Sequence, residues 1–114
     1  MFGNNSLSLN RVYDNIKIRE GSETLSLHVN NDPGRIVAGL NEAQKRLKSI
    51  DQDTNEESRK EIALFFAAAI FGEEQAKQIL DFYYGDSYCV ISICSKYFSE
   101  RLAKKITEAQ KKAK

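Results

Sequence analysis

The longest apolar stretch of the chain is Ile62–Phe71, ten consecutive hydrophobic residues with charged residues on both sides. A membrane-spanning helix needs about 20 such residues, so this run is too short to cross a bilayer. A helix that is apolar on every face must be covered on all sides. We therefore expect either the central helix of a small bundle or a helix partly covered by another molecule.

Alternating apolar and polar residues predict a β-hairpin over residues 11–30, around the turn-forming segment Glu20–Glu23. An isolated two-stranded hairpin is marginally stable in water, so its apolar face should lie against helices. Residues 1–10 show no such period and are expected to form a flexible arm. The apolar positions are Val12, Ile16 and Ile18 before the turn and Leu25, Leu27 and Val29 after it.

A helical region is predicted over residues 32–113, and it begins with two helices. Asp32 as N-cap and Pro33 at the first helical position start a helix that should end near Ile50. A capping box of Thr54 and Glu57 starts the second helix, which should run to a stop at Gly72. The apolar stripe of the first helix is Ile36, Leu40, Ala43, Leu47 and Ile50.

Two further helices follow, the third over Glu74–Tyr84 with a stop at Gly85 and the last capped by Asp86. The sequence thus predicts one domain over residues 1–114, mainly α, with an N-terminal β-hairpin followed by a compact four-helix bundle. The last helix is expected to bury one face, with Val90 and Tyr97 beside it. That face consists of Ile91, Cys94, Phe98, Leu102, Ile106 and Ala109.

Charge is unevenly distributed, although the formal net charge of the 114 residues is only +1. Residues 1–95 carry 10 Lys/Arg and 14 Asp/Glu, whereas residues 96–114 carry seven and two. Cations at a helix C-terminus complement the helix dipole, so a solvated helix end is the favoured interpretation. The alternatives are an acidic partner or nucleic acid.

No pattern of catalytic or metal-binding residues is found, so we expect neither an enzyme nor a cofactor or metal. His28, the single histidine, falls on the polar face of a predicted strand, without an acid or nucleophile pattern around it. Cys89 and Cys94, five residues apart on one helix, point in different directions and lack zinc-ligand spacing. Unpaired thiols and the absence of a signal-peptide pattern predict an intracellular protein.

Aromatic residues are the remaining candidates for function. Three adjacent rings on one helix span about 200°, so at least one of Phe82, Tyr83 and Tyr84 must face away from the core. Exposed tyrosines are typical anchors in protein interfaces. A helix–turn–helix at Gly85 is disfavoured, because the would-be recognition helix begins SYCVISIC, without side chains that read base edges.

The C-terminal half carries two segments that match a known pattern: ALFFAAAIFGEEQAKQILDFYYGD and CVISICSKYFSERLAKKITEAQKK. In these segments the chain resembles the small tail assembly chaperones of long-tailed phages and prophages of Gram-positive bacteria. The resemblance covers roughly residues 57–114 and extends loosely to the hairpin and to Asp32-Pro33.

The resemblance implies a mostly helical, non-enzymatic chaperone that coats the tape-measure protein before the tail tube polymerises. It also implies self-association into a homo-oligomer or spiral, with the tail tube protein as a further candidate partner. The chaperone would act in the bacterial host cytoplasm and be absent from the mature virion, with no membrane partner. Residues expected to contribute to protein binding are Phe65, Phe66, Phe71, Tyr83 and Tyr84.

Two other functions remain open. A small virion structural protein, of the tail-completion or connector type, would be retained in purified particles. A nucleic-acid-binding adaptor would use the basic terminal helix and bind in a salt-dependent manner. It is the least favoured of the three.

Overall fold

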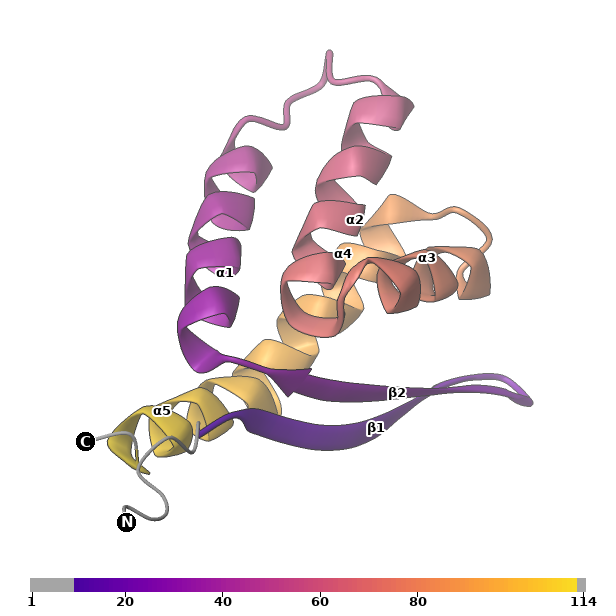
Figure 1. Ribbon diagram of the computed structural model, residues 1–114. Coiled ribbons are helices and arrows are strands. Elements are labelled where there is room, and N and C mark those ends of the chain that lie inside the picture. The colour runs from indigo at the N-terminus through magenta and orange to yellow at the C-terminus, as the bar shows by residue number, and fades with distance from the viewer. Residues whose placement is uncertain (1–9, 113–114) are drawn as a thin grey trace, which may run out of the picture.

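The computed structural model describes residues 10–112, and it is mainly helical, with an N-terminal antiparallel hairpin followed by four helices (Figure 1). The predicted fold class is therefore confirmed. The arm expected over residues 1–10 lies, apart from Asn10, outside the described residues. The elements are β1 (Val12–Glu20), β2 (Glu23–Asn31), α1 (Pro33–Lys48), α2 (Glu56–Phe71), α3 (Glu73–Phe82), α4 (Ser87–Tyr97), the π-helical turn η1 (Phe98–Leu102) and α5 (Ala103–Lys112). The last three follow one another without a break and together form the fourth helix.

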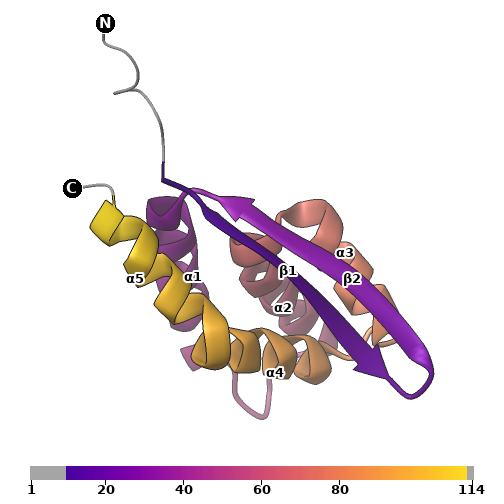
Figure 2. The ribbon, with the colours of Figure 1, turned by 90° about the horizontal axis from the view of Figure 1, so that it is seen from below.

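The hairpin turns through Gly21-Ser22, with Glu20 opposite Glu23. Gly21 has φ +61°, a conformation that L residues with side chains adopt only with strain. The apolar face lies against the helices as expected: β1 contacts α5, and β2 contacts α2 and α3 (Figure 2). The buried hairpin residues are Val12, Ile18, Leu27 and Val29.

Helix α1 begins as predicted, with the Asp32 carboxylate accepting a 3.0 Å hydrogen bond from the Arg35 amide and with Pro33 in the first turn. Ile36 and Ala43 of its apolar stripe are buried. The other stripe residues, Leu40, Leu47 and Ile50, are only half-buried.

The capping box predicted for α2 is wrong by one residue. Asn55 is the N-cap, and its side-chain oxygen accepts a 2.8 Å hydrogen bond from the Ser58 amide. The Thr54 hydroxyl instead accepts a 2.9 Å bond from the Asp51 amide. Asparagine is at least as good an N-cap as threonine, so the loop uses Thr54 to close on Asp51 and leaves capping to Asn55.

The apolar run Ile62–Phe71 forms most of α2, which contacts α1, α3, α4 and β2. It is therefore the central helix of the fold, which was the first of the two alternatives expected from the sequence. Its covering is nevertheless incomplete. The buried residues are Ala63, Phe66, Ala67, Ile70 and Phe71, whereas Ile62, Leu64, Phe65, Ala68 and Ala69 are only half-buried.

Glycines end α2 and follow α3, as the sequence predicted. Gly72, at φ +88°, donates a 2.9 Å bond to the Ala68 carbonyl oxygen. At the end of α3, Tyr84 takes a left-handed conformation (φ +55°) and Gly85 donates a 2.8 Å bond to the Leu80 carbonyl oxygen. The Asp86 side chain then caps α4 by accepting bonds from two amides.

The face predicted for the last helix is partly wrong. Tyr97 is buried, whereas Phe98 is 37% exposed and Ile91 is half-buried. The π-helical turn η1 adds one residue to the helical turn, so Leu102, five positions after Tyr97, lies on the same buried face. The core residues of this segment are Val90, Cys94, Tyr97, Leu102, Ile106 and Ala109.

Candidate protein-binding surface

The structure separates the five residues predicted to bind protein. Phe66 and Phe71 are 7% and 8% exposed and belong to the core, where the Phe71 ring stacks on Tyr97 at a centroid distance of 5.7 Å. Their rings are therefore not available to a partner. Phe65, Tyr83 and Tyr84 keep exposed ring surface, but they do not line one common site.

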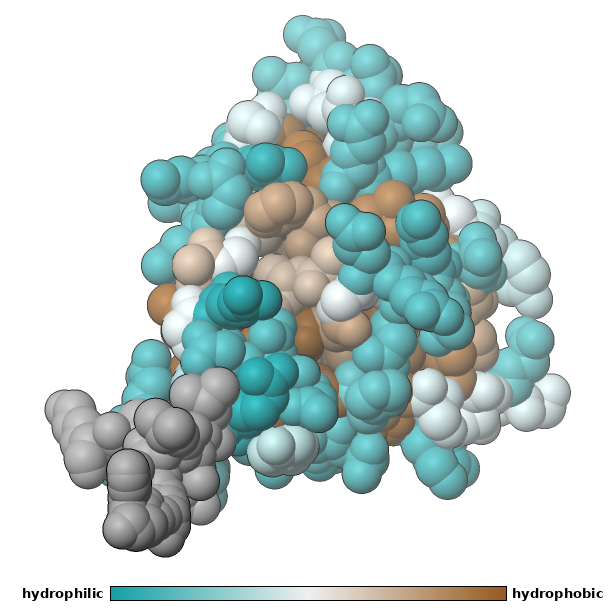
Figure 3. Space-filling view, viewed as in Figure 1, coloured by the Kyte–Doolittle hydropathy of each residue, from teal (hydrophilic) through white to brown (hydrophobic). Residues whose placement is uncertain are grey.

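Phe65 lines a hollow between α2 and α3 with a volume of about 340 Å³, here called the α2–α3 groove. Its apolar floor consists of Leu64, Phe65, Ala68 and Ala76. Figure 3 shows brown and tan side chains across the middle of this side of the molecule, bordered by teal ones. The charged rim consists of Arg46, Glu61, Glu73 and Lys77.

The rim of the α2–α3 groove also contacts its floor. The Arg46 guanidinium carbon lies 3.9 Å from the centre of the Phe65 ring, a cation–π contact from α1. Glu42 holds the same guanidinium with a 3.3 Å ion pair. Arg46 therefore keeps Phe65 in place at the edge of the groove without covering the whole ring.

A second hollow, about 260 Å³ in volume, lies between α1 and α4. Leu40 and Leu47 line it from α1, and the exposed Phe98 lines it from η1. Phe98 was expected in the core, but its ring lies at this surface hollow. Apolar side chains therefore line two separate hollows, this one and the α2–α3 groove.

Tyr83 and Tyr84 lie elsewhere, at the junction of α3 and α4. Tyr83 is half-buried and packs edge-on against Phe82 at a centroid distance of 5.2 Å; burial, followed by the nearby Glu20 carboxylate, raises its pKa. Tyr84 is 84% exposed and donates a 3.2 Å bond to Glu23 at the hairpin tip. The prediction that one of the three adjacent rings faces away from the core is confirmed. Tyr84 also lines a separate hollow at the start of α4, together with Tyr88, which is 60% exposed.

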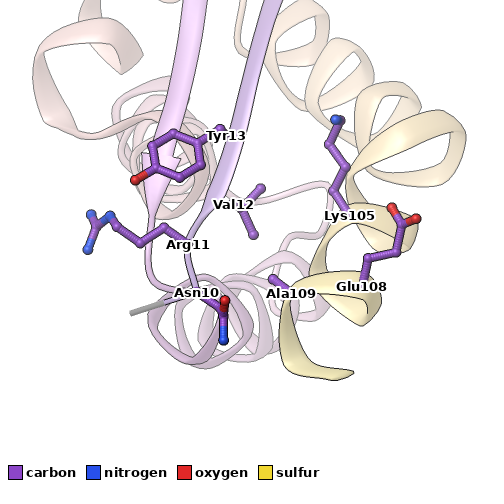
Figure 4. A pocket seen from close by; sticks show the side chains of 7 residues that line it. All are labelled: Asn10, Arg11, Val12, Tyr13, Lys105, Glu108 and Ala109. Carbon is purple, nitrogen blue, oxygen red and sulfur yellow. The ribbon is translucent and has the colours of Figure 1, made fainter. Parts of the chain in front are cut away.

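A further hollow lies where the chain enters β1 (Figure 4). Val12 from β1 and Ala109 from α5 lie on its two sides, with Lys105 and Glu108 along α5, whereas the Arg11 side chain points away from α5. Val12 and Ala109 are 2% and 4% exposed, so they offer almost no apolar surface to a ligand in this hollow.

The described residues contain no group of three His, Cys, Asp or Glu side chains that could hold a metal ion. His28 is exposed, as predicted. Cys94 is buried, and burial raises its pKa to about 12, so it is a poor nucleophile in the folded protein. Among the helices described here, none has the length and apolar character required to traverse a bilayer.

Asp14 is a charged residue on the helix-facing side of β1 that the sequence analysis did not single out. Its side chain is 6% exposed, and its carboxylate accepts a 2.7 Å hydrogen bond from the Tyr97 hydroxyl. It also forms an ion pair with Arg101, and Lys105 Nζ lies 3.9 Å away. The only signal in the sequence was an acid at an alternating position between Val12 and Ile16, both apolar.

Comparison with known proteins adds no relative: no protein-family profile, curated protein or solved structure matches the chain.

Proposed function

We propose that this protein is a non-enzymatic tail assembly chaperone that binds the tape-measure protein of a long-tailed phage and keeps it soluble. Two observations support the proposal: the resemblance of residues 57–114 and the apolar surface left open on the central helix. The observation that carries it is that Leu64 and Phe65 are only half-buried and line the α2–α3 groove.

The α2–α3 groove suits one face of an amphipathic helix. Such a helix presents apolar side chains at intervals of three and four residues, and these can lie on a floor of Leu64, Phe65 and Ala68. The rim carries charges of both signs, so it can contact a client of mixed charge without a strong requirement for sequence. A chaperone needs such moderate, reversible binding.

The other parts of the proposal follow the same family resemblance. The chaperone would act in the cytoplasm of the bacterial host, self-associate into a homo-oligomer or spiral, and contact the tail tube protein. It would be absent from the mature virion. The second apolar hollow, lined by Leu40, Leu47 and Phe98, offers surface for contacts beyond the client.

Co-expression with a tape-measure protein tests the proposal. We expect the wild-type chain to raise the soluble fraction of the tape-measure protein and to co-purify with it. The double variant Leu64→Ser/Phe65→Ser should lose both effects because it makes the groove floor polar. Tyr13→Ser is the matched control, since Tyr13 is 61% exposed on the hairpin face opposite the helices.

Circular dichroism must first show that both variants are folded. Absence of any solubility gain and of co-purification with the wild-type chain would reject the proposal. Detection of the protein in purified virions at a fixed copy number would instead favour the virion structural protein.

A further inference from the structure

The hairpin has two edges, and one of them is already occupied. On β2, the Gln75 side chain bonds both main-chain groups of His28: its oxygen accepts from the amide at 2.9 Å, and its nitrogen donates to the carbonyl oxygen at 2.8 Å. The Gln75 side-chain amide thus makes the two hydrogen bonds that the main chain of a neighbouring strand would make. The outer edge of β2 is covered at this point by α3.

The bonding of His28 also determines what the other edge presents. His28 lies opposite Asn15, and both of its main-chain groups point outward, so this pair is not hydrogen-bonded across the hairpin. By alternation, Lys17 and Arg19 likewise direct their amide and carbonyl groups to the outer edge of β1. Within the described residues, no hydrogen bond from a side chain or loop reaches the main chain of Lys17 or Arg19.

A hollow of about 350 Å³ runs along this free edge, between β1 and the α4–η1 segment; we call it the β1–α4 groove. Figure 2 shows β2 on one side of β1 and α4 on the other. The floor of the groove is apolar and includes Ile16, Ile93 and Tyr97. A strand edge, a helix wall and an apolar floor together form the kind of site in which an extended peptide is added to a sheet.

The rim of the β1–α4 groove is basic. Lys17, Arg19 and Lys96 are exposed around it, and none of them forms an ion pair with an acid in the part of the chain that the structure describes. Glu100 is the one acid among the lining residues, and Arg101 is engaged by Asp14. The groove therefore has an unbalanced positive charge.

We propose that the β1–α4 groove binds an extended acidic segment of a protein partner, which pairs with β1 as a third strand. Alternate side chains of the added strand would face the floor at Ile16 and Ile93, which favours apolar residues there. The intervening side chains would lie beside Lys17 and Arg19, which favours Asp or Glu because opposite charges on neighbouring strands stabilise the pair. This site is separate from the α2–α3 groove, so it does not depend on the proposed chaperone function.

Fluorescence anisotropy with a labelled, end-blocked (Val-Glu)₃ peptide and the full chain tests the inference. Two derivatives of this peptide are compared: in one the first, third and fifth amides are N-methylated, and in the other the second, fourth and sixth. Each derivative therefore lacks the hydrogen-bond donors of one strand edge, while its charge and apolar side chains are unchanged. We expect one derivative to bind at least tenfold more weakly and the other to stay within threefold of the parent peptide. A (Val-Lys)₃ peptide should also bind at least tenfold more weakly.

Protein variants give a second, matched comparison. Lys17→Glu/Lys96→Glu should weaken binding of (Val-Glu)₃ at least tenfold, whereas Lys45→Glu/Lys48→Glu, with the same charge change on exposed positions of α1, should not. The main-chain amide signals of Lys17 and Arg19 should shift on titration.

Three results would overturn the inference. Equal binding of both methylated derivatives would show that no strand is added. Binding of oligothymidylate as tight as that of (Val-Glu)₃ would show a general polyanion surface. Absence of peptide binding at millimolar concentration would show that the cations only protect the β1 edge against pairing.

Discussion

The Tyr97 hydroxyl on α4 donates a 2.7 Å hydrogen bond to the Asp14 carboxylate on β1, 83 positions earlier in the chain. This bond connects the N-terminal hairpin to the C-terminal helix. The Asp14 side chain is only 6% exposed, so the charge needs partners inside the fold. Tyr97 and Arg101 supply them from consecutive helical turns.

Replacing Tyr97 with phenylalanine should destabilise the protein by about 2 kcal/mol, because a hydrogen bond to a charged, largely buried group is lost while the ring packing is kept. Urea unfolding measures the change. Tyr13→Phe is the matched control: Tyr13 is 61% exposed, and its variant should stay within about 0.5 kcal/mol of the wild type. Equal effects of the two substitutions would contradict the role given to the Asp14 contact.

The sequence indicated those features that depend on near neighbours. Asp32, Gly72 and Asp86 act on groups a few positions away, so helix starts and stops could be predicted. The π-helical turn could not, because it goes with contacts between residues far apart in the chain. Tyr97 and Arg101 contact Asp14 in β1, and Leu102, five positions after Tyr97, is buried in the core.

The candidate site could be predicted only in part, for a related reason. Three adjacent aromatics guarantee that one ring is exposed, and Tyr84 is that ring. A helix that is apolar on every face gives no period, so the difference between the half-buried Phe65 and the buried Phe66 follows from where α1, α3 and α4 lie. Tertiary packing alone decides it.

Deleting Ser99 should be tolerated. The residue is exposed within η1, and its removal reduces the interval from Tyr97 to Leu102 to four positions, which an ordinary α-helix places on one face. We expect the free energy of unfolding to stay within about 1 kcal/mol of the wild type, the scatter typical of a neutral change. Inserting an alanine after Ser99 should instead abolish cooperative unfolding, because Leu102 and Ile106 would rotate out of the core. A folded insertion variant would refute this account of the π turn.

Gly39→Ala should destabilise the protein, although alanine is the better helix former. A Cβ atom at Gly39 would lie 2.7 Å from the Ala69 Cβ and 3.4 Å from its Cα, so α1 and α2 would have to separate. Overpacking costs about 1–3 kcal/mol, against a gain of about 1 kcal/mol in helix propensity. Thermal unfolding should therefore show a lower Tm.

A double-mutant cycle with Ala69→Gly tests the same contact. Ala69→Gly alone should cost about 1 kcal/mol through helix propensity. In the pair Gly39→Ala/Ala69→Gly the two methyl groups no longer meet, so the double variant should be more stable than the sum of the single changes predicts. Strict additivity would mean that the close approach of the two helices is not what limits residue 39.

Stability should fall at alkaline pH because of Cys94. Burial raises the pKa of its thiol from 9.0 to about 12, so between these values the unfolded chain has lost a proton that the folded protein keeps. The free energy of unfolding should then decrease by up to about 1.4 kcal/mol per pH unit from this residue. Urea unfolding from pH 8 to pH 11 should show a shallower decrease in the free energy of unfolding for Cys94→Ala than for the wild type.

Cys89→Ala is the control. Cys89 is only half-buried, so its replacement should change the slope less. Equal slopes in the two variants would mean that Cys94 is reached by water in the folded protein.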